Sequence, residues 1–475
     1  MSIKPLVFIP GFPASELRQL STGRAFFPPS LGDLLSDAKK AEIVRLLSGP
    51  DVPPGDIVPG EPIRSFLQIG KLEIGKLAAS LYDILRTHYN YTIDSGDNFR
   101  HIGWDWRDAI DASRVQNDVA GKIEELSAAN GGAKVVVLAH STGGLILRRL
   151  LEQRPALTQK IEQILAFGIP WIGTLAAVKY LIKGEKFGLG PASLDAARVR
   201  DVMRRCQAAY DLFPPDPGKT DMHSPSGQAA NLFVATDPAP RHQVGPLVDL
   251  TWVRPADPNV AAKAGLADAR LGTRPSTISI PGFATPPITN IAGWGVEMET
   301  TCVLGPLGGI TFEKTKESDG TIPTVSASWL RGPGVRTFFV PIGLYPGDAI
   351  PFHHDRIWDS PPVRQLFDEV LVDRERRPYV HGSADIDEAI DAESDLTVRL
   401  VAADPAGQPL PDVRFQFRGL TAHPQSFANH PRIDVRLPKD LIRPDSQRVV
   451  RMTIDVTWGT GGPNERGEVS IVYKR

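Results

Sequence analysis

KVVVLAHSTGGLILRRLL, residues 134–151, is the stretch that decides the fold. It opens with a β-branched run of strand length, turns on small residues and continues as a leucine-rich helix with no linker between them. An uninterrupted apolar run of this kind is typical of a strand that is buried on both faces of a parallel sheet. A strand, a tight turn and a helix in immediate succession therefore predict a βα unit of an α/β fold.

The turn of this unit contains a nucleophile-elbow motif. Ala139-His140-Ser141-Thr142-Gly143 matches G-x-S-x-G with Ala at the first position. The strained turn brings the residues two before and two after the serine into contact, so both must be small. The motif predicts Ser141 as a nucleophile at the carboxyl end of the strand, and the alternative interpretation is an ordinary βα turn.

Further patterns extend the α/β alternation on both sides of this unit. Apolar runs predict strands, and aliphatic residues at helical spacing predict helices. The strands are expected at 6–9, within 161–170, at 289–294 and at 335–340, and the helices at 77–88 and 115–126. Residues 185–288 lack sustained periodicity, with 13 prolines between 210 and 290, which predicts an inserted cap over one edge of the sheet.

The chain changes character after residue 370, where the α/β domain of residues 1–370 is expected to end. A strongly charged segment at 371–394 predicts a linker, because it cannot bury much apolar area. Apolar and polar residues then alternate in several short runs over 395–475. This alternation predicts a small C-terminal antiparallel β-sandwich.

Composition excludes several classes of protein and site. Lys and Arg number 53 against 55 Asp and Glu, and the net charge of -2 gives no global field for attracting nucleic acid. No apolar span reaches the ~20 residues that a bilayer needs, and the run Leu6–Ile9 is too short for a secretory signal, so a cytoplasmic location is expected. Cys206 and Cys302 are expected as buried thiols, with one bridge between them as the alternative, and no metal or cofactor is predicted.

A serine nucleophile needs a general base and an acid that orients it, and in this kind of fold the chain order is serine, acid, histidine. Five of the ten histidines follow the later strands, and three of those five lie in the linker or the β region. The base is therefore His353 or His354. Asp319, within SDGTIP at 318–323, has the position required of the acid, with Asp249 and Asp105 as alternatives.

The oxyanion that forms in acyl transfer needs two backbone donors. One is the N–H of Thr142, the residue after the nucleophile. The other is the N–H of Phe12, in the turn after the first strand, where Gly11 lets the backbone come close. Trp104 and Trp171 are candidate substrate-binding residues, and the alternative for each is a place in the hydrophobic core.

Six segments in chain order resemble the lecithin:cholesterol acyltransferase-like lipases. This family is a branch of the α/β-hydrolases that includes lysosomal phospholipase A2 and phospholipid:diacylglycerol acyltransferases. The segments are VFIPGF at 7–12, GWDWRDA at 103–109, AHSTGG at 139–144, GIPWIGT at 168–174, IAGWGVEMET at 291–300 and SDGTIP at 318–323. Ala139 and Ser318 replace a family glycine, Trp104 replaces a tyrosine, and 185–288 aligns with nothing in the family.

The resemblance implies an α/β-hydrolase fold in which Ser141 is the nucleophile, Asp319 the acid and His354 the base. His354 is preferred to His353 because the family base precedes an aliphatic residue by three positions, a proline by seven and a valine by nine. The matching residues here are Ile357, Pro361 and Val363.

The predicted function is serine-dependent hydrolysis or transfer of the acyl groups of lipid esters through an acyl-enzyme, without a cofactor. The expected partners are a lipid or other ester, a membrane surface in transient contact, and a protein bound by the C-terminal β domain, but no nucleic acid. Two alternatives stay open. One is a peptidase or amidase on the same triad, and the other is a catalytically silent binding protein that uses the sandwich for recognition.

Overall fold

The computed structural model divides the chain into two compact units, residues 2–367 and 368–475. In the first unit it describes 3–213 except 50–51, 54, 70–71, 77, 94–95 and 190–191, then 222–223, then 277–367 except 279, 281, 295, 305–309, 316–317, 331–332, 342–353 and 360. In the second unit it describes 368–372, 379–384, 396–403, 413–417, 425–427, 432–437, 449–458 and 465–474.

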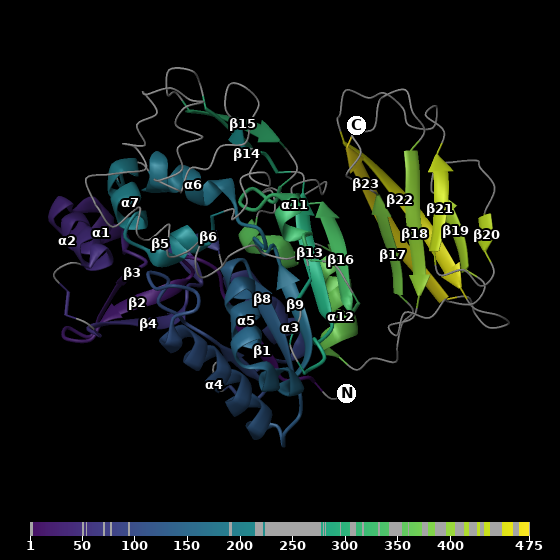
Figure 1. Ribbon diagram of the computed structural model, residues 1–475, viewed down its shortest axis with the longest axis horizontal. Coiled ribbons are helices and arrows are strands. Elements are labelled where there is room, and N and C mark those ends of the chain that lie inside the picture. Colours follow the sequence, from purple (N-terminus) through teal and green to yellow (C-terminus); the bar gives the residue numbers. More distant parts are fainter. Residues whose placement is uncertain are drawn as a thin grey trace. The chain divides into compact units, whose positions relative to one another are not determined.

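A six-stranded parallel sheet forms the centre of the first unit (Figure 1). Its spatial order is β16-β13-β9-β8-β1-β7, and all of its pairings in the described residues are parallel. The expected α/β-hydrolase class is confirmed. Strands β8 and β1 lie in the interior of the sheet, where an uninterrupted apolar strand can be buried on both faces. The strands are β1 (Leu6–Ile9), β7 (Phe99–His101), β8 (Val135–His140), β9 (Ile161–Phe167), β13 (Ile288–Trp294) and β16 (Val335–Pro341).

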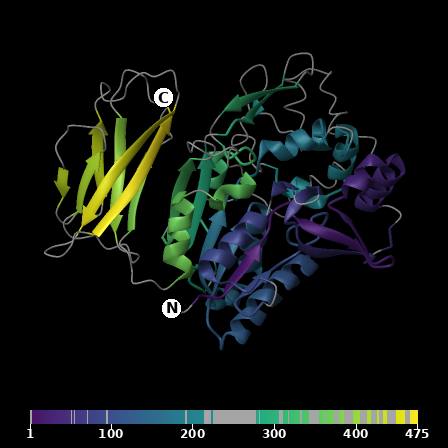
Figure 2. The ribbon, with the colours of Figure 1, turned by 180° about the vertical axis from the view of Figure 1, so that it is seen from behind.

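Helices cover both faces of this sheet (Figures 1 and 2). Side chains of a strand alternate between its two faces, so Val7 and Ile9 join the core under α4 and α5, whereas Phe8 contacts Tyr82 of α3 on the opposite face. Phe367 of α12 packs against α3 on that same face. The four helices are α3 (Ala78–Tyr89), α4 (Ser113–Ala129), α5 (Thr142–Gln153) and α12 (Pro361–Leu371).

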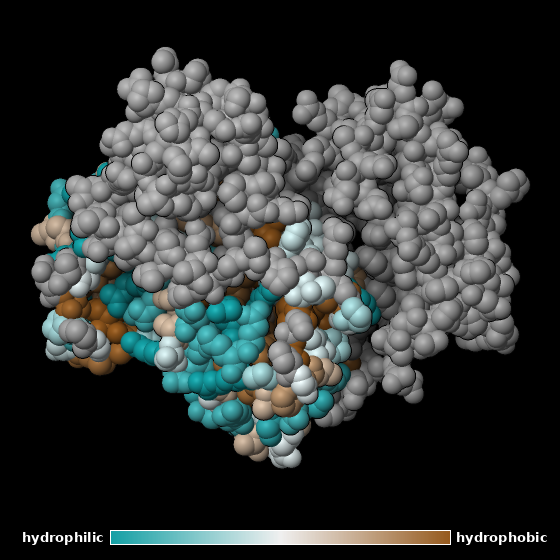
Figure 3. Space-filling view, in the orientation of Figure 1, coloured by the Kyte–Doolittle hydropathy of each residue, from teal (hydrophilic) through white to brown (hydrophobic). Residues whose placement is uncertain are grey.

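The helix expected at 115–126 is amphipathic as its spacing predicts. Val119 and Ile123 of α4 are fully buried, and the outer surface over α4 and α5 is largely hydrophilic in Figure 3. Burial of one stripe against the sheet is what stabilises such a helix in a globular domain. Within the described residues, no helix combines the length and the apolar character that crossing a bilayer requires.

Short elements lie between the main strands of the sheet. The three-stranded sheet β3-β2-β4 was not predicted from the sequence, because its strands are short and β4 contains Pro59 and Gly60. The elements before α5 are β2 (Ser15–Gln19), β3 (Arg24–Phe27), α1 (Leu31–Leu35), α2 (Asp37–Ser48), β4 (Ile57–Pro62), β5 (Ser65–Ile69) and β6 (Leu72–Lys76). Those after it are η1 (Pro155–Lys160), α6 (Leu175–Ile182), β14 (Met298–Leu304), β15 (Ile310–Thr315), α11 (Thr324–Ala327) and η4 (His354–Asp359).

The range expected to form a cap, 185–288, lies largely outside the described residues. Its described part folds into short elements after α6. Cys206 is buried there and its thiol contacts the carbonyl of Val202 at 3.3 Å, while the side chain of Cys302 lies outside the described part. The elements are β10 (Phe187–Leu189), β11 (Ala192–Leu194), α7 (Ala196–Met203), α8 (Gln207–Asp211) and β12 (Met222–His223).

The described residues of the second unit form two antiparallel sheets, as the alternation after residue 395 predicts. One sheet has the order β17-β18-β21 and the other β20-β19-β22-β23. Strand β17 falls within 371–394, the range expected to be a linker, and pairs with β18, so this part of the range belongs to a sheet. The strands are β17 (Tyr379–Ala384), β18 (Leu396–Ala403), β19 (Val413–Phe417), β20 (Gln425–Phe427), β21 (Arg432–Leu437), β22 (Val449–Trp458) and β23 (Glu465–Lys474).

The N-terminus of α5 approaches the end of β1 so closely that only glycine fits between them. A Cβ placed on Gly143 would lie 2.4 Å from the carbonyl oxygen of Ile9 and 2.9 Å from that of Pro10. These are backbone atoms, which cannot move aside as a flexible side chain can. The small residue that the motif requires after Ser141 is therefore explained by helix-to-strand packing.

Replacing Gly143 by Ala should destabilise the protein by about 1–3 kcal/mol, because the added methyl group overpacks the β1–α5 contact. Gly121→Ala is the matched control, since a Cβ at this position in the middle of α4 meets nothing within 4 Å. It should stabilise the protein by about 0.5–1 kcal/mol through helix propensity. Chemical denaturation of both variants measures the difference, and an equal response would contradict the proposed packing constraint.

Candidate active site

Ser141 occupies the turn between β8 and α5 in a strained backbone conformation. Its φ is 52° and its ψ is -128°, a region that residues other than glycine rarely enter and that persists only where the surroundings enforce it. Its N–H donates to the carbonyl of Phe167, at the end of β9, over 2.9 Å. A Cβ on Gly11 would lie 2.6 Å from Ser141 Cβ, so the turn after β1 lies directly beside the serine.

Asp319 and His354, which are 35 residues apart, form a buried hydrogen-bonded pair. His354 Nδ1 lies 2.6 Å from Asp319 Oδ2. Asp319 Oδ1 accepts from the backbone N–H groups of Thr321 and Ile322 at 3.0 and 2.7 Å. The carboxylate is fully buried, so both of its oxygens have the donors that a buried charge requires.

The charge of Asp319 controls the protonation of His354. Burial alone lowers the pKa of His354, but the negative charge of Asp319 and its hydrogen bond outweigh burial, with a further contribution from Asp355, and the pKa is raised above 6.5. The ion pair therefore stabilises the folded protein at pH values below the pKa that His354 has in the unfolded chain. This contribution is lost as the pH rises through the higher pKa that His354 has in the folded protein.

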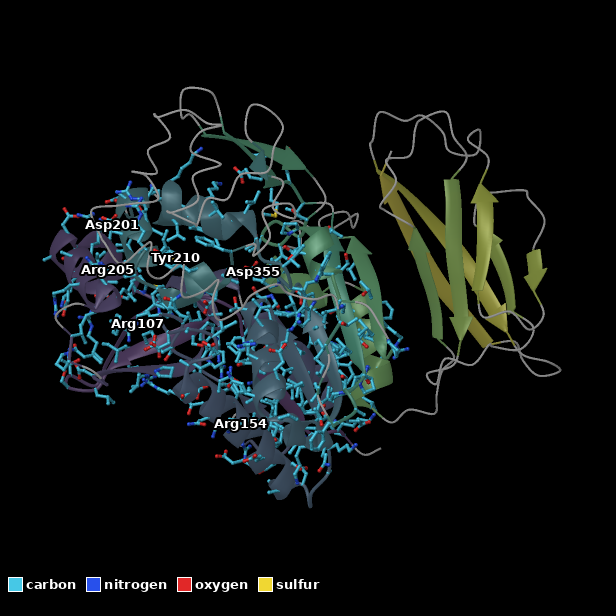
Figure 4. The ribbon with its side chains drawn as sticks, in the orientation of Figure 1. Arg107, Arg154, Asp201, Arg205, Tyr210 and Asp355 are labelled. Carbon is cyan, nitrogen blue, oxygen red and sulfur yellow. The ribbon has the colours of Figure 1, made fainter. Side chains whose placement is uncertain are left out.

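Two structural connections bring His354 to the edge of the sheet where Ser141 lies. Phe167 accepts the Ser141 N–H, and the next residue, Gly168, has a φ of 54° and would place a Cβ 2.8 Å from His354 Nδ1 and from Asp319 Oδ2. The second connection is His140, whose Nε2 lies 3.0 Å from the carbonyl oxygen of His354. Figure 4 labels Asp355, the residue after His354, near the carboxyl ends of the central strands.

The second ring nitrogen of His354, Nε2, is available for proton transfer. This atom is buried and has no hydrogen-bond partner among the described residues. A buried imidazole whose Nδ1 side is held by a carboxylate, and whose Nε2 is unengaged, can take a proton from a hydroxyl and return it to a leaving group. His353 and Asp249, the alternatives for base and acid, lie outside the described residues.

The two residues expected to supply oxyanion donors flank Ser141. Thr142 begins α5, so its N–H has no acceptor one turn earlier in the helix. Phe12 follows Gly11 in the turn after β1, and its ring packs edge-on against Trp106 at 5.5 Å between centroids. Both backbone segments therefore belong to the same small region around the serine.

Trp104 and Trp171 are both buried, which matches the core alternative for each. Trp104 is 0% exposed, and its indole N–H donates to the carbonyl of Pro10 at 3.1 Å, while its backbone N–H donates to Ser15 Oγ. Trp171 is 2% exposed and donates to Asn290 Oδ1 at 3.1 Å. Indole rings are buried where their N–H finds an acceptor, and in Trp104 this bond holds the turn that carries Phe12.

Asp105, the other alternative for the acid, is engaged elsewhere. It forms a two-pronged ion pair with Arg107, with distances of 2.9 and 2.6 Å. Arg107 also donates to the carbonyl of Leu46 in α2. Asp105 therefore joins the segment 104–107 to α2, and Asp319 is the carboxylate that contacts a histidine of the candidate site.

The family model of lecithin:cholesterol acyltransferase matches residues 62–254 of the chain. The resemblance to this family is confirmed. The matched residues include the Ser141 elbow and the segment 104–107, whereas Asp319 and His354 lie beyond them.

Two curated relatives carry related names. Lecithin-cholesterol acyltransferase-like 1 of Arabidopsis thaliana is 32% identical over 105 residues, which are 22% of this chain and 24% of that protein. Phosphatidylcholine-sterol acyltransferase of Rattus norvegicus is 26% identical over 149 residues, which are 30% of this chain and 32% of that protein. The matches thus span about a quarter of the length of the first of these curated relatives and about a third of the second.

Solved structures are also similar to this chain. The Tle4–Tli4 complex aligns with a TM-score of 0.46 and 13% identity over 76% of this chain and 96% of that chain. The mature form of a lipase from Bacillus licheniformis aligns with a TM-score of 0.33 and 12% identity over 78% of this chain and 92% of that chain. The α/β-hydrolase fold of this chain is evident from the strand order of its parallel sheet and from the strained turn at Ser141.

The electrostatics of the Asp319–His354 pair can be measured without a substrate. In a ¹⁵N-histidine NMR titration, His354 should titrate above its ordinary pKa, and Asp319→Asn should lower that pKa because burial then acts without the opposing charge. Resonances are assigned through a His354→Gln variant. A wild-type His354 that titrates below its ordinary pKa would contradict the pairing.

Proposed function

We propose that this chain is a serine-dependent hydrolase or acyltransferase that acts on the acyl esters of lipids. The observation that carries the proposal is the buried Asp319–His354 pair, whose unengaged Nε2 lies at the sheet edge that also holds the strained Ser141. The lipid class of the substrate is supported by the lecithin:cholesterol acyltransferase model that matches residues 62–254.

In the proposed first step, Ser141 Oγ attacks the carbonyl carbon of the ester while His354 Nε2 takes the hydroxyl proton. Asp319 stabilises the imidazolium that results, because its carboxylate already accepts a hydrogen bond from Nδ1–H. The carbonyl oxygen becomes an oxyanion, and the N–H groups of Thr142 and Phe12 are the donors that would stabilise it.

In the proposed second step, the tetrahedral intermediate collapses and His354 returns the proton to the departing alcohol. The acyl group is then bonded to Ser141 Oγ. Water or another alcohol attacks this acyl-enzyme, again giving its proton to His354 Nε2, and the released serine recovers that proton. Attack by water completes hydrolysis and attack by an alcohol completes transfer.

Two tryptophans form hydrogen bonds with the segment 10–15, which contains Phe12. Trp104 donates to Pro10 and to Ser15, and Trp106 donates its indole N–H to the carbonyl of Ser15 at 3.1 Å. Donors act on an oxyanion without a reorganisation penalty only when they are fixed beforehand. Trp104 is therefore proposed to act on the reaction through the turn that it holds, and not through contact with substrate.

A fluorophosphonate probe tests the nucleophile. Ser141→Ala should abolish covalent labelling and lower kcat on a nitrophenyl ester by about 10⁴-fold or more, since both reactions need the activated hydroxyl. Ser127→Ala is the matched control, because it removes another buried serine hydroxyl, in α4, that has no partner in the described structure. This control should label like the wild type, and labelling of Ser141→Ala at the wild-type rate would end the proposal.

A substrate panel tests the lipid class. Phosphatidylcholine vesicles with and without a sterol, a triacylglycerol emulsion and short peptides are offered to the wild type and to Ser141→Ala, and products are measured by mass spectrometry. The rat relative is named as a phosphatidylcholine-sterol acyltransferase, so the sterol arm separates transfer from hydrolysis. We expect Ser141-dependent release or transfer of acyl groups from a lipid, and cleavage of peptides in preference to every ester would contradict the proposal.

A further inference from the structure

His140, the residue before the proposed nucleophile, is in contact with the proposed base. Its Nε2 lies 3.0 Å from the carbonyl oxygen of His354, and the two rings are 4.5 Å apart between centroids with an interplanar angle of 34°. Trp358 packs edge-on against the His140 ring at 4.9 Å. His140 is 5% exposed, so this contact is made inside the protein.

The geometry defines the protonation state of His140. A carbonyl oxygen only accepts hydrogen bonds, so the Nε2 atom that faces it must carry the proton. Burial and the nearby charge of His354 lower the pKa of His140 well below 6.5, with the hydrogen bond to the His354 carbonyl opposing them in part. His140 is therefore neutral at physiological pH, with its proton on Nε2.

The neutral state suits a ring beside a catalytic base. His354 becomes an imidazolium during the proposed reaction, and a second positive charge next to it would oppose that change. A neutral ring adds no such repulsion. Its N–H can still hold the backbone of His354 in place.

His354 is held on several sides by the elements around Ser141. Its backbone N–H donates to the carbonyl of Asp319 at 3.0 Å, its Nδ1 contacts the carboxylate of Asp319, and its carbonyl accepts from His140. The first two bonds come from the acid loop. The third comes from β8, the strand that ends at the nucleophile, so it joins the base directly to the element that carries the serine.

We propose that His140 is a positioning residue, whose Nε2–H fixes the His354 backbone relative to Ser141 and thereby aims the base at the nucleophile. This inference rests on the proposed function. A phenylalanine would fill a similar volume and pack against the same ring, so packing alone does not require a histidine. What the imidazole adds is a hydrogen-bond donor to the carbonyl of the base.

Three variants separate the donor from the ring. His140→Phe keeps a ring without a donor, His140→Gln keeps a donor without a ring, and His140→Leu keeps neither. Small misplacements of a reacting group lower rates steeply, so His140→Phe should lower kcat on a nitrophenyl ester by roughly 10- to 100-fold with little change in KM. It should slow fluorophosphonate labelling similarly, and His140→Gln should recover part of both losses.

Tyr91→Phe is the matched control for a lost buried hydrogen bond. The Tyr91 hydroxyl also donates to a backbone carbonyl, that of Lys4, at 2.7 Å, but next to the start of β1 and away from the carboxyl ends of the strands. This variant should keep the wild-type kcat whatever its change in thermal stability. Circular dichroism and thermal melting verify that each variant is folded.

Four outcomes are decisive. A folded His140→Phe with the wild-type kcat overturns the positioning role, and so does a His140→Gln that is no faster than His140→Leu. If His140→Phe does not fold, a faster His140→Gln than His140→Leu supports the role. A wild-type protein that neither labels at Ser141 nor cleaves esters overturns the proposed function and, with it, this inference. The first two outcomes differ from this one, because they contradict the positioning role alone.

Discussion

The close approach between the N-terminus of α5 and the end of β1 is the constraint on which the site depends. Gly143 lies where a Cβ would meet the carbonyl oxygen of Ile9, and Gly11 lies where a Cβ would meet Ser141. With strand and helix this close, the chain has no room for a wider turn, and Ser141 is held at a positive φ. The same packing brings the Thr142 N–H and the turn that contains Phe12 close to the serine, so the proposed nucleophile and both proposed donors have one structural cause.

Buried hydrogen bonds and ion pairs fix the parts of the site that lie outside the central sheet. Asp319 accepts hydrogen bonds from two backbone N–H groups and from the imidazole of His354. These bonds compensate the cost of burying its carboxylate. The segment 104–107 plays a comparable role beside the turn after β1 that contains Phe12, because Trp104 donates to this turn and Asp105 pairs with Arg107, which reaches α2. Each bond is internal and directional, so the geometry of the site is set before any substrate arrives.

Local sequence patterns predicted the main strands of the central sheet and the turn at Ser141. Strands β1, β8, β13 and β16 follow from continuous apolar runs, and the elbow follows from small residues on both sides of Ser141. The patterns left alternatives open where two environments use the same residue types. An aromatic residue beside a strand fits a hydrophobic core or a substrate-binding surface, and only the structure shows that Trp104 is fully buried with its indole N–H bonded to Pro10. Strand β17 was missed because its pairing with β18, and not its charged neighbourhood, makes it a strand.

The sequence by itself determined the parallel α/β architecture and the sharp turn at Ser141, because apolar periodicity and small residues are written locally along the chain. Only the tertiary structure decided which groups touch. Asp319 meets His354 across 35 positions, and His140 meets the same histidine across 214. Hydrogen bonds and electrostatic shifts depend on distances through space, and those distances exist only after the sheet has brought the ends of its strands together.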